Sequence, residues 1–286
     1  MTTATPARRK SGLVPFLLIT FATSWLSWLI AIAVGGPAMS FPTVIPYLLG
    51  AFGPMFGAIV IRLRRAFRRL PAPAHAVRLP LISLLWVPIL LVVASGTVLA
   101  AVLIAQQLGG PAISPEAAQG LIQAAGGPAP FVATMLVFGP LAEEFGLRGT
   151  AHPRLRASMG RLLAGLLLGI IWSVWHLPLF FVPGTVQASF GLLTWSGLVY
   201  MLSVIPMALL AGYAYERAGV LGAIAIHFGV NTTMALAGVN SLLPQVSIVA
   251  VQAVVALALL AVHRDRRQPG GSPERQAATA PAAHPA

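Results

Sequence analysis

Long apolar stretches alternate with short polar segments along most of this chain. Each stretch holds about twenty residues, the length at which an α-helix crosses the hydrocarbon core of a bilayer. The pattern therefore predicts an all-α, polytopic membrane protein with about eight transmembrane helices. The predicted helices cover residues 13–35, 44–61, 81–105, 131–149, 162–182, 191–214, 220–238 and 242–262.

Composition supports this interpretation. Of the 286 residues, 57% are apolar and only 8% are charged, whereas about a quarter of the residues in a soluble domain are charged. The mean hydropathy is +0.85. The sequence contains no cysteine, which excludes disulfides and a thiol nucleophile.

The positive charge of the chain follows the predicted topology. The net charge of +12 comes from 18 Lys and Arg residues against 6 Asp and Glu residues, and every basic residue falls on one side of the predicted membrane. The positive-inside rule then places both termini in the cytoplasm, and it explains the charge without a nucleic-acid partner. The Arg-rich, Lys-poor composition favours a bacterial plasma membrane. The basic residues are Arg8, Arg9, Lys10, Arg62, Arg64, Arg65, Arg68, Arg69, Arg78, Arg148, Arg154, Arg156, Arg161, Arg217, Arg264, Arg266, Arg267 and Arg275.

Three segments are predicted along the chain. Residues 1–12 form a cytoplasmic N-terminal segment, residues 13–263 one membrane-embedded domain, and residues 264–286 a cytoplasmic tail with the composition of a disordered end. The first apolar stretch is too long for a signal peptide and is interpreted as a retained helix. The segment 106–130, rich in Gly, Pro and Ala, is predicted to be an irregular outside loop.

A few small or polar residues within the apolar stretches suggest contacts between helices. Glycines four residues apart, Gly53 with Gly57 and Gly165 with Gly169, favour close approach of neighbouring helices. Gln252 is predicted to form an interhelical hydrogen bond. No internal repeat is detectable, although transporters that bury polar residues often show one.

The ionisable residues in the apolar stretches need a reason, because each costs roughly 2.5–3.5 kcal/mol at the centre of a spanning helix on insertion scales. The strongest candidates are Glu143, Glu144, His176 and His227, together with Asn231, which follows His227 by four residues. The other histidines, His152 among them, are predicted to be solvated in loops or tails.

Glu143 and Glu144 end the fourth apolar stretch. Glu144 and Arg148 are four residues apart, in the orientation that favours an ion pair on one helix face. Glu143 is rotated by about 100° from Glu144, so it can face a wet cavity and act as a general base. The alternative is a buried ion-pair network that uses both carboxylates. Gly139 and Pro140, one turn earlier, predict a kink.

The two histidines each have a neighbour at helical spacing. Trp172 shares a helix face with His176, and Asn231 shares one with His227. An imidazole and a carboxamide on one face can donate hydrogen bonds to a developing oxyanion. The alternatives are a hydrogen-bonded core histidine for His176 and a polar helix–helix contact for His227 and Asn231.

The motifs AEEFGLRG, WSVWHLP and HFGVN together resemble those of the CPBP family of intramembrane peptidases, which includes CAAX prenyl endopeptidases and bacterial Abi proteins. That family has E-E-x-x-x-R, an aromatic residue four positions before a His, and H-x-x-x-N or H-x-x-x-D, in this order on three helices. The aromatic position is usually Phe, and here it is Trp172. The similarity covers about residues 131–235, and the eight-helix topology fits the whole chain.

This resemblance implies an intramembrane endopeptidase that cleaves near the cytoplasmic side, in CAAX-like cleavage or in bacteriocin processing and immunity. Glu143 and His176 are expected to activate a water, and His227 and Asn231 to stabilise the oxyanion. Glu144, Arg148 and Trp172 would support the site. The implied partners are the lipid bilayer and a protein or peptide substrate, with a prenylated substrate as one option. A membrane scaffold or a transporter is the alternative function.

Two questions about the site stay open at this point. Glu143, His176 and His227 match the ligand types of a catalytic zinc site with one open position, but there is no H-E-x-x-H motif, and Asn231 suits an oxyanion hole better. We therefore predict that no cofactor is required, with zinc or another divalent metal as the alternative. His176 is also predicted to lie deeper than Glu143, unless residues 150–165 form a cytoplasmic extension.

Overall fold

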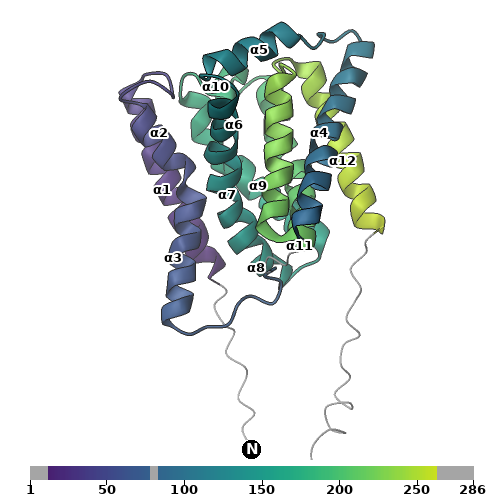
Figure 1. Ribbon diagram of the computed structural model, residues 1–286. Coiled ribbons are helices and arrows are strands. Elements are labelled where there is room, and N and C mark those ends of the chain that lie inside the picture. Colours follow the sequence, from purple (N-terminus) through teal and green to yellow (C-terminus); the bar gives the residue numbers. More distant parts are fainter. Residues whose placement is uncertain (1–11, 78–82, 263–286) are drawn as a thin grey trace, which may run out of the picture.

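The computed structural model describes residues 12–77 and 83–262. Every regular element in these two ranges is a helix, which confirms the all-α prediction (Figure 1). The predicted N-terminal segment, apart from Gly12, and the predicted tail lie outside the described residues, as do their basic residues and Arg78. The elements are α1 (Leu13–Val34), α2 (Val44–Ala51), α3 (Gly53–Phe67), α4 (Ser83–Gln107), α5 (Pro115–Ala124), α6 (Pro128–Leu136), η1 (Val137–Leu141), α7 (Ala142–Gly146), η2 (Leu147–Ala151), α8 (His152–Arg156), α9 (Arg161–Trp175), η3 (Leu177–Phe181), α10 (Val186–Phe190), α11 (Trp195–Leu236) and α12 (Leu242–Val262).

The helices account for all the apolar stretches of the sequence. Within the described ranges, six helical spans are long and apolar enough to cross a membrane, or seven if α2 and α3, bent by 48°, count as one span. The protein is therefore an integral membrane protein, with a count close to the eight spans predicted. The difference arises in α11, which includes two predicted stretches in one element of 42 residues.

The chain reverses direction within α11. Ala218 and Gly219 have non-helical backbone angles, and Gly219 has a φ of 64°, which glycine adopts readily. In a straight helix, Val204 and His227 would lie about 35 Å apart at 1.5 Å per residue, yet both line the same cavity. Residues before and after Gly219 therefore form two legs that lie side by side, as two spans would.

The fourth span runs from Pro128 to Arg156 and is longer than predicted. Two π-helical turns, η1 and η2, flank the short helix α7. Phe138 has non-helical backbone angles next to Gly139 and Pro140, so the predicted kink is confirmed. An extension between 150 and 165 is also present, but it is α8 that extends the fourth span, whereas α9 begins at Arg161 as expected.

This extension brings Glu143 and His176 to a similar depth. Glu143 lies about 20 Å along its span from Arg156, and His176 lies about 22 Å from Arg161, at 1.5 Å per residue. The difference in depth that the sequence suggested is therefore absent.

Most of the described arginines gather at one end of the bundle, which we name the arginine-rich end. The second half of α3, α8, the start of α9 and the break in α11 all lie at the bottom of Figure 1, and α5 lies at the opposite end. This one-sided distribution agrees with the predicted topology, while the orientation in the membrane stays a prediction. The arginines at this end are Arg62, Arg64, Arg65, Arg68, Arg69, Arg154, Arg156, Arg161 and Arg217.

Two loop predictions were wrong. His152 is 2% exposed, not solvated, because it packs against Tyr215 and Glu216 of α11. The segment 106–130 is not wholly irregular, since it contains α5, whose first turn is capped by the Ser114 side chain accepting a hydrogen bond from the Ala117 N–H.

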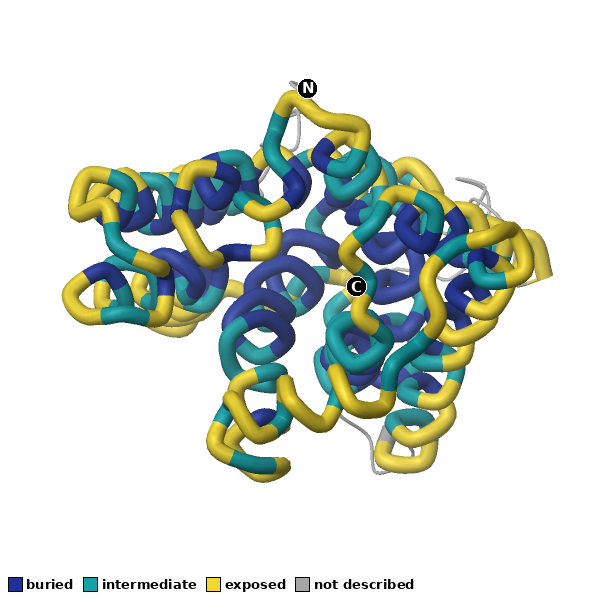
Figure 2. Tube along the Cα trace, turned by 90° about the horizontal axis from the view of Figure 1, so that it is seen from above, coloured by how far each residue is buried: buried dark blue, intermediate teal, exposed yellow. Residues whose placement is uncertain are grey.

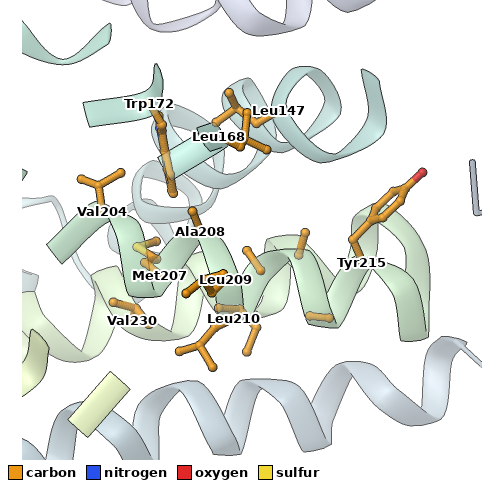
Figure 3. Packing of buried hydrophobic residues seen from close by; sticks show 14 of the residues in the cluster. Leu147, Leu168, Trp172, Val204, Met207, Ala208, Leu209, Leu210, Tyr215 and Val230 are labelled. Atoms are coloured by element: carbon orange, nitrogen blue, oxygen red, sulfur yellow. The ribbon is translucent and has the colours of Figure 1, made fainter. Parts of the chain in front are cut away.

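Close helix contacts depend on the glycine pairs identified in the sequence. A Cβ on Gly53 would lie 2.0 Å from Ser24 Oγ, and one on Gly165 would lie 2.4 Å from a Leu209 methyl group, so neither position has room for a side chain. In the packed interior, Leu168 and Trp172 of α9 face Ala208 and Leu209 of α11 (Figure 3). Seen from above, buried positions face the middle of the bundle and exposed positions face its periphery (Figure 2), where lipid would surround the apolar side chains.

Candidate active site

A cavity of about 170 Å³ lies inside the bundle and is lined by residues of nine of its helical elements. This volume holds several water molecules. The predicted residues Glu143, Trp172, His176, His227 and Asn231 all line it. Glu144 and Arg148 lie behind this wall, fully buried.

Three polar atoms converge beside Gly139 in the wall of the cavity. A Cβ placed on Gly139 would lie 3.4 Å from His227 Nε2, 3.6 Å from Asn231 Nδ2 and 3.8 Å from Glu143 Oε1. The absence of a side chain at Gly139 thus leaves a small space that a carboxylate oxygen, an imidazole nitrogen and an amide nitrogen all border. The fourth predicted span, which carries Gly139 and Glu143, therefore meets the seventh, which carries His227 and Asn231. A shared site requires this contact.

Glu144 forms the ionic support of the site. Arg148 Nη1 donates to Glu144 Oε1 at 2.8 Å, and the same oxygen accepts from His227 Nδ1 at 2.8 Å. Side chains of all three are at most 3% exposed. Because a buried charge needs a partner, Arg148 balances Glu144, and Glu144 holds the His227 ring in place.

Glu143 has a different partner. Its Oε2 accepts a hydrogen bond of 2.6 Å from Trp172 Nε1. The two adjacent glutamates therefore separate, one toward the Arg148 guanidinium and the other toward the cavity. This separation favours the functional interpretation over a network that uses both carboxylates on Arg148.

Both histidines direct Nε2 away from the groups that hold them. His176 ends α9, and its Nδ1 lies 2.8 Å from the Trp172 carbonyl oxygen. A carbonyl or carboxylate oxygen only accepts, so Nδ1 carries the proton in His176 and in His227. In the neutral rings, Nε2 is then the acceptor.

Several residues of the cavity wall were missed in the sequence. The ring of Tyr200 meets that of His176 edge-to-face at 5.8 Å between centroids, and Gln187 Nε2 donates to Tyr200 Oη at 2.5 Å. Tyr47 also lines the cavity. Tyrosines are common near membrane interfaces, and Gln187 lies outside the predicted spans, so no sequence signal distinguished them.

The cavity extends from the predicted catalytic residues away from the arginine-rich end. Tyr47 of α2, Gln187 of α10 and Met234 near the end of α11 line it, and α2 and α10 lie toward the opposite end of the bundle in Figure 1. Because the orientation in the membrane is a prediction, the side on which cleavage occurs stays a prediction as well.

The proposed metal ligands do not form a ligand set here. Within the described ranges, no three His, Cys, Asp or Glu side chains are grouped so that they could hold a metal ion. We therefore assign no metal ligands, and the prediction that no cofactor is required stays a prediction.

Comparison with known proteins finds a family model that matches the segment holding these residues. A sequence model of the family described as Type II CAAX prenyl endopeptidase Rce1-like matches residues 125–233, which contain all seven predicted site residues. CAAX prenyl protease 2 of Methanococcus maripaludis is 33% identical over 109 residues, which make up 37% of this chain and 40% of that protein. The chain thus matches less than half the length of this curated relative. Over residues 125–233, the resemblance inferred from the three motifs is confirmed: this segment is similar to the Rce1-like CAAX prenyl endopeptidases.

Proposed function

We propose that this protein is an intramembrane endopeptidase in which Glu143 and His176 activate a water for attack on a peptide bond. The observation that carries the proposal is the convergence of Glu143 Oε1, His227 Nε2 and Asn231 Nδ2 on the space beside Gly139. Each of these atoms belongs to a residue that is costly inside a membrane, and together they provide a base and two groups that can border an oxyanion.

In this mechanism, the water sits between Glu143 Oε1 and His176 Nε2. The carboxylate takes one proton as the water oxygen bonds to the scissile carbonyl carbon. The carbonyl oxygen becomes an oxyanion, and Asn231 Nδ2 donates a hydrogen bond to it. Glu143 then passes its proton to the departing amine as the C–N bond breaks, which restores the carboxylate.

His227 joins the oxyanion site through its contact with Glu144. The ring donates through Nε2 only when both of its nitrogens carry protons. The Glu144 carboxylate at Nδ1 balances the charge of that imidazolium, in the way that a buried carboxylate does beside the histidine of a serine protease triad. Arg148 keeps Glu144 ionised and oriented.

The substrate that we propose is a protein or peptide. The relative from M. maripaludis is named a CAAX prenyl protease, so a prenylated C-terminus is one substrate to test. Bacteriocin processing or immunity is the other, as the motifs suggested. We place the protein in a bacterial plasma membrane with both termini cytoplasmic.

Cleavage of peptides by protein purified into lipid nanodiscs tests this function. A farnesylated and an unprenylated peptide of one sequence would be compared, each with a fluorophore and quencher across the cleavage site. We expect wild type to cleave at least one of them and Glu143→Gln to cleave neither, with the thermal melting temperature unchanged. If Glu143→Gln preserves the cellular phenotype of wild type, the protein acts as a scaffold or transporter and not as a protease.

The question of a cofactor has its own experiment. We expect activity to survive extended treatment with a chelator, and elemental analysis of the purified protein to find less than stoichiometric metal. Loss of activity that stoichiometric zinc restores would contradict this expectation.

A further inference from the structure

We infer that Trp172 is a positioning residue, whose indole N–H fixes the orientation of the Glu143 carboxylate. The inference rests on the proposed function, since it concerns how the base is held. The family pattern usually has Phe at this position, and a phenyl ring has no hydrogen-bond donor. The tryptophan of this chain is therefore more than a conservative replacement.

Trp172 contacts Glu143, Arg148 and both histidines of the site. Its Nε1 donates to Glu143 Oε2 at 2.6 Å, and its backbone carbonyl accepts from His176 Nδ1 at 2.8 Å. The Arg148 guanidinium lies over the indole ring at 4.4 Å from its centroid, and the His227 ring packs edge-to-face with the indole at 5.2 Å between centroids. The side chain is 2% exposed, so packing holds the indole in one place.

The hydrogen bond determines which carboxylate oxygen is free to react. Since Oε2 is held by the indole, Oε1 is the oxygen that faces His227 and Asn231 across the space beside Gly139. A carboxylate without this donor could rotate about its last bond or turn toward Arg148. Loss of the N–H should therefore reduce the fraction of molecules in which the base is aligned, and misplacement of about 1 Å can cost on the order of 100-fold in rate.

Trp175, three residues further along α9, provides a matched control for the loss of an indole ring. It also lines the cavity, lies on α9 and contacts the His176 ring at 4.8 Å between centroids. Its Nε1, however, is buried and has no hydrogen-bond partner among the residues that the structure describes. Trp175→Phe therefore removes the same atoms beside the same histidine without removing a hydrogen bond.

Kinetics of the two variants provide the first test. We expect Trp172→Phe to lower kcat about 10- to 100-fold with little change in KM or melting temperature, and Trp175→Phe to lower kcat at least five times less. Equal losses in the two variants would overturn the inference, because they would reflect only the smaller ring. A loss of Trp172→Phe activity that follows a lower melting temperature would do the same.

A spectroscopic test does not depend on proteolysis. In protein labelled with ¹⁵N-tryptophan, the indole N–H resonance of Trp172 is assigned by its absence in Trp172→Phe. We expect this resonance to move upfield in Glu143→Leu, which lacks the acceptor, while the Trp175 resonance moves much less. An unchanged Trp172 resonance would overturn the inference. If the Trp172 resonance shifts but the wild-type protein cleaves no peptide, the hydrogen bond to Glu143 is supported and the proposed function is wrong.

Discussion

Two ionic clusters of this protein contain the same residue types but differ in burial and in which groups remain free to react. At the arginine-rich end, Glu216 accepts from Arg156 at 2.7 Å and from Arg161 at 2.5 Å, and His152 lies 3.5 Å away. In the site, Glu144 pairs with Arg148 and His227. Each cluster joins helices that are distant in sequence.

The difference between the clusters is the second carboxylate. Glu216 has two guanidinium groups for one carboxylate, so its acceptor capacity is used for holding α8 and α9 against α11. Glu143 has a neutral indole as its hydrogen-bond partner and lines a cavity. A buried ionic cluster thus indicates function when one of its acids is left beside space that water can enter, and structure when cations saturate it.

Replacing the two acids should produce the largest contrast. Glu143→Gln keeps the shape and an acceptor for the Trp172 N–H, so we expect activity to fall about 10²- to 10⁴-fold, the contribution of a general base, with stability unchanged. Glu216→Gln leaves Arg156 and Arg161 facing a neutral amide. It should retain activity and lose about 1–3 kcal/mol of unfolding free energy, less than a fully buried pair would lose. Peptide cleavage measures activity, and denaturant titration in micelles measures stability. A Glu143→Gln variant with wild-type activity would contradict the catalytic role assigned to Glu143.

Replacing one arginine of each cluster should give the next largest effect, on stability. Arg148→Met leaves the Glu144 charge buried beside His227 alone, and breaking a buried pair costs about 3–5 kcal/mol. The Arg161 side chain is 28% exposed, and Glu216 keeps Arg156 in Arg161→Met. That variant should lose at most about 1 kcal/mol. Similar losses for both variants, measured by denaturant unfolding, would show that the two clusters do not differ in burial as described.

One glycine near each cluster offers the smallest and most local test. In Gly139→Ala, the added methyl group would lie 3.4 Å from His227 Nε2, an ordinary contact, but it would occupy the space assigned to water and substrate. We expect activity to fall about tenfold, as for a small misplacement of reacting groups, without loss of stability.

The matched change near the Glu216 cluster, Gly212→Ala, should lower stability and leave activity unchanged. In Gly212→Ala, the methyl group would lie 2.9 Å from His152 Cε1, so the ring must move within a packed interior. We expect a loss of about 1–3 kcal/mol in unfolding free energy, as for overpacking, and a peptidase as active as wild type below its melting temperature. A Gly139→Ala variant with full activity would mean that the space beside Gly139 is not where the reaction occurs.

The residues of the site could be predicted because hydrocarbon makes polar groups conspicuous. Glu143, His176 and His227 are among the few ionisable residues in the apolar stretches, and the structure brings them to one cavity. The same rule failed at the helix ends. Glu216 and His152 lie outside the predicted spans, so nothing in the sequence distinguished a buried ionic cluster there from solvated residues.

The roles of the neighbouring aromatic residues depended on geometry that spacing does not encode. Trp172 was selected for its helix face with His176, but the donor contact from its indole to Glu143 joins residues 29 positions apart. Tyr200 reaches His176 because the first leg of α11 packs closely against α9, a contact between helices that spacing alone does not predict.

The sequence by itself determined that this chain is a bundle of membrane helices with a small set of polar groups inside it. Hydrophobic length is a property of each segment alone, and only a helix satisfies its backbone within one segment in lipid. Tertiary structure alone decided which of two adjacent glutamates meets the arginine and which meets the cavity. That choice depends on how each helix is rotated about its axis, and here two π-helical turns and the packing of α9 and α11 set the rotation.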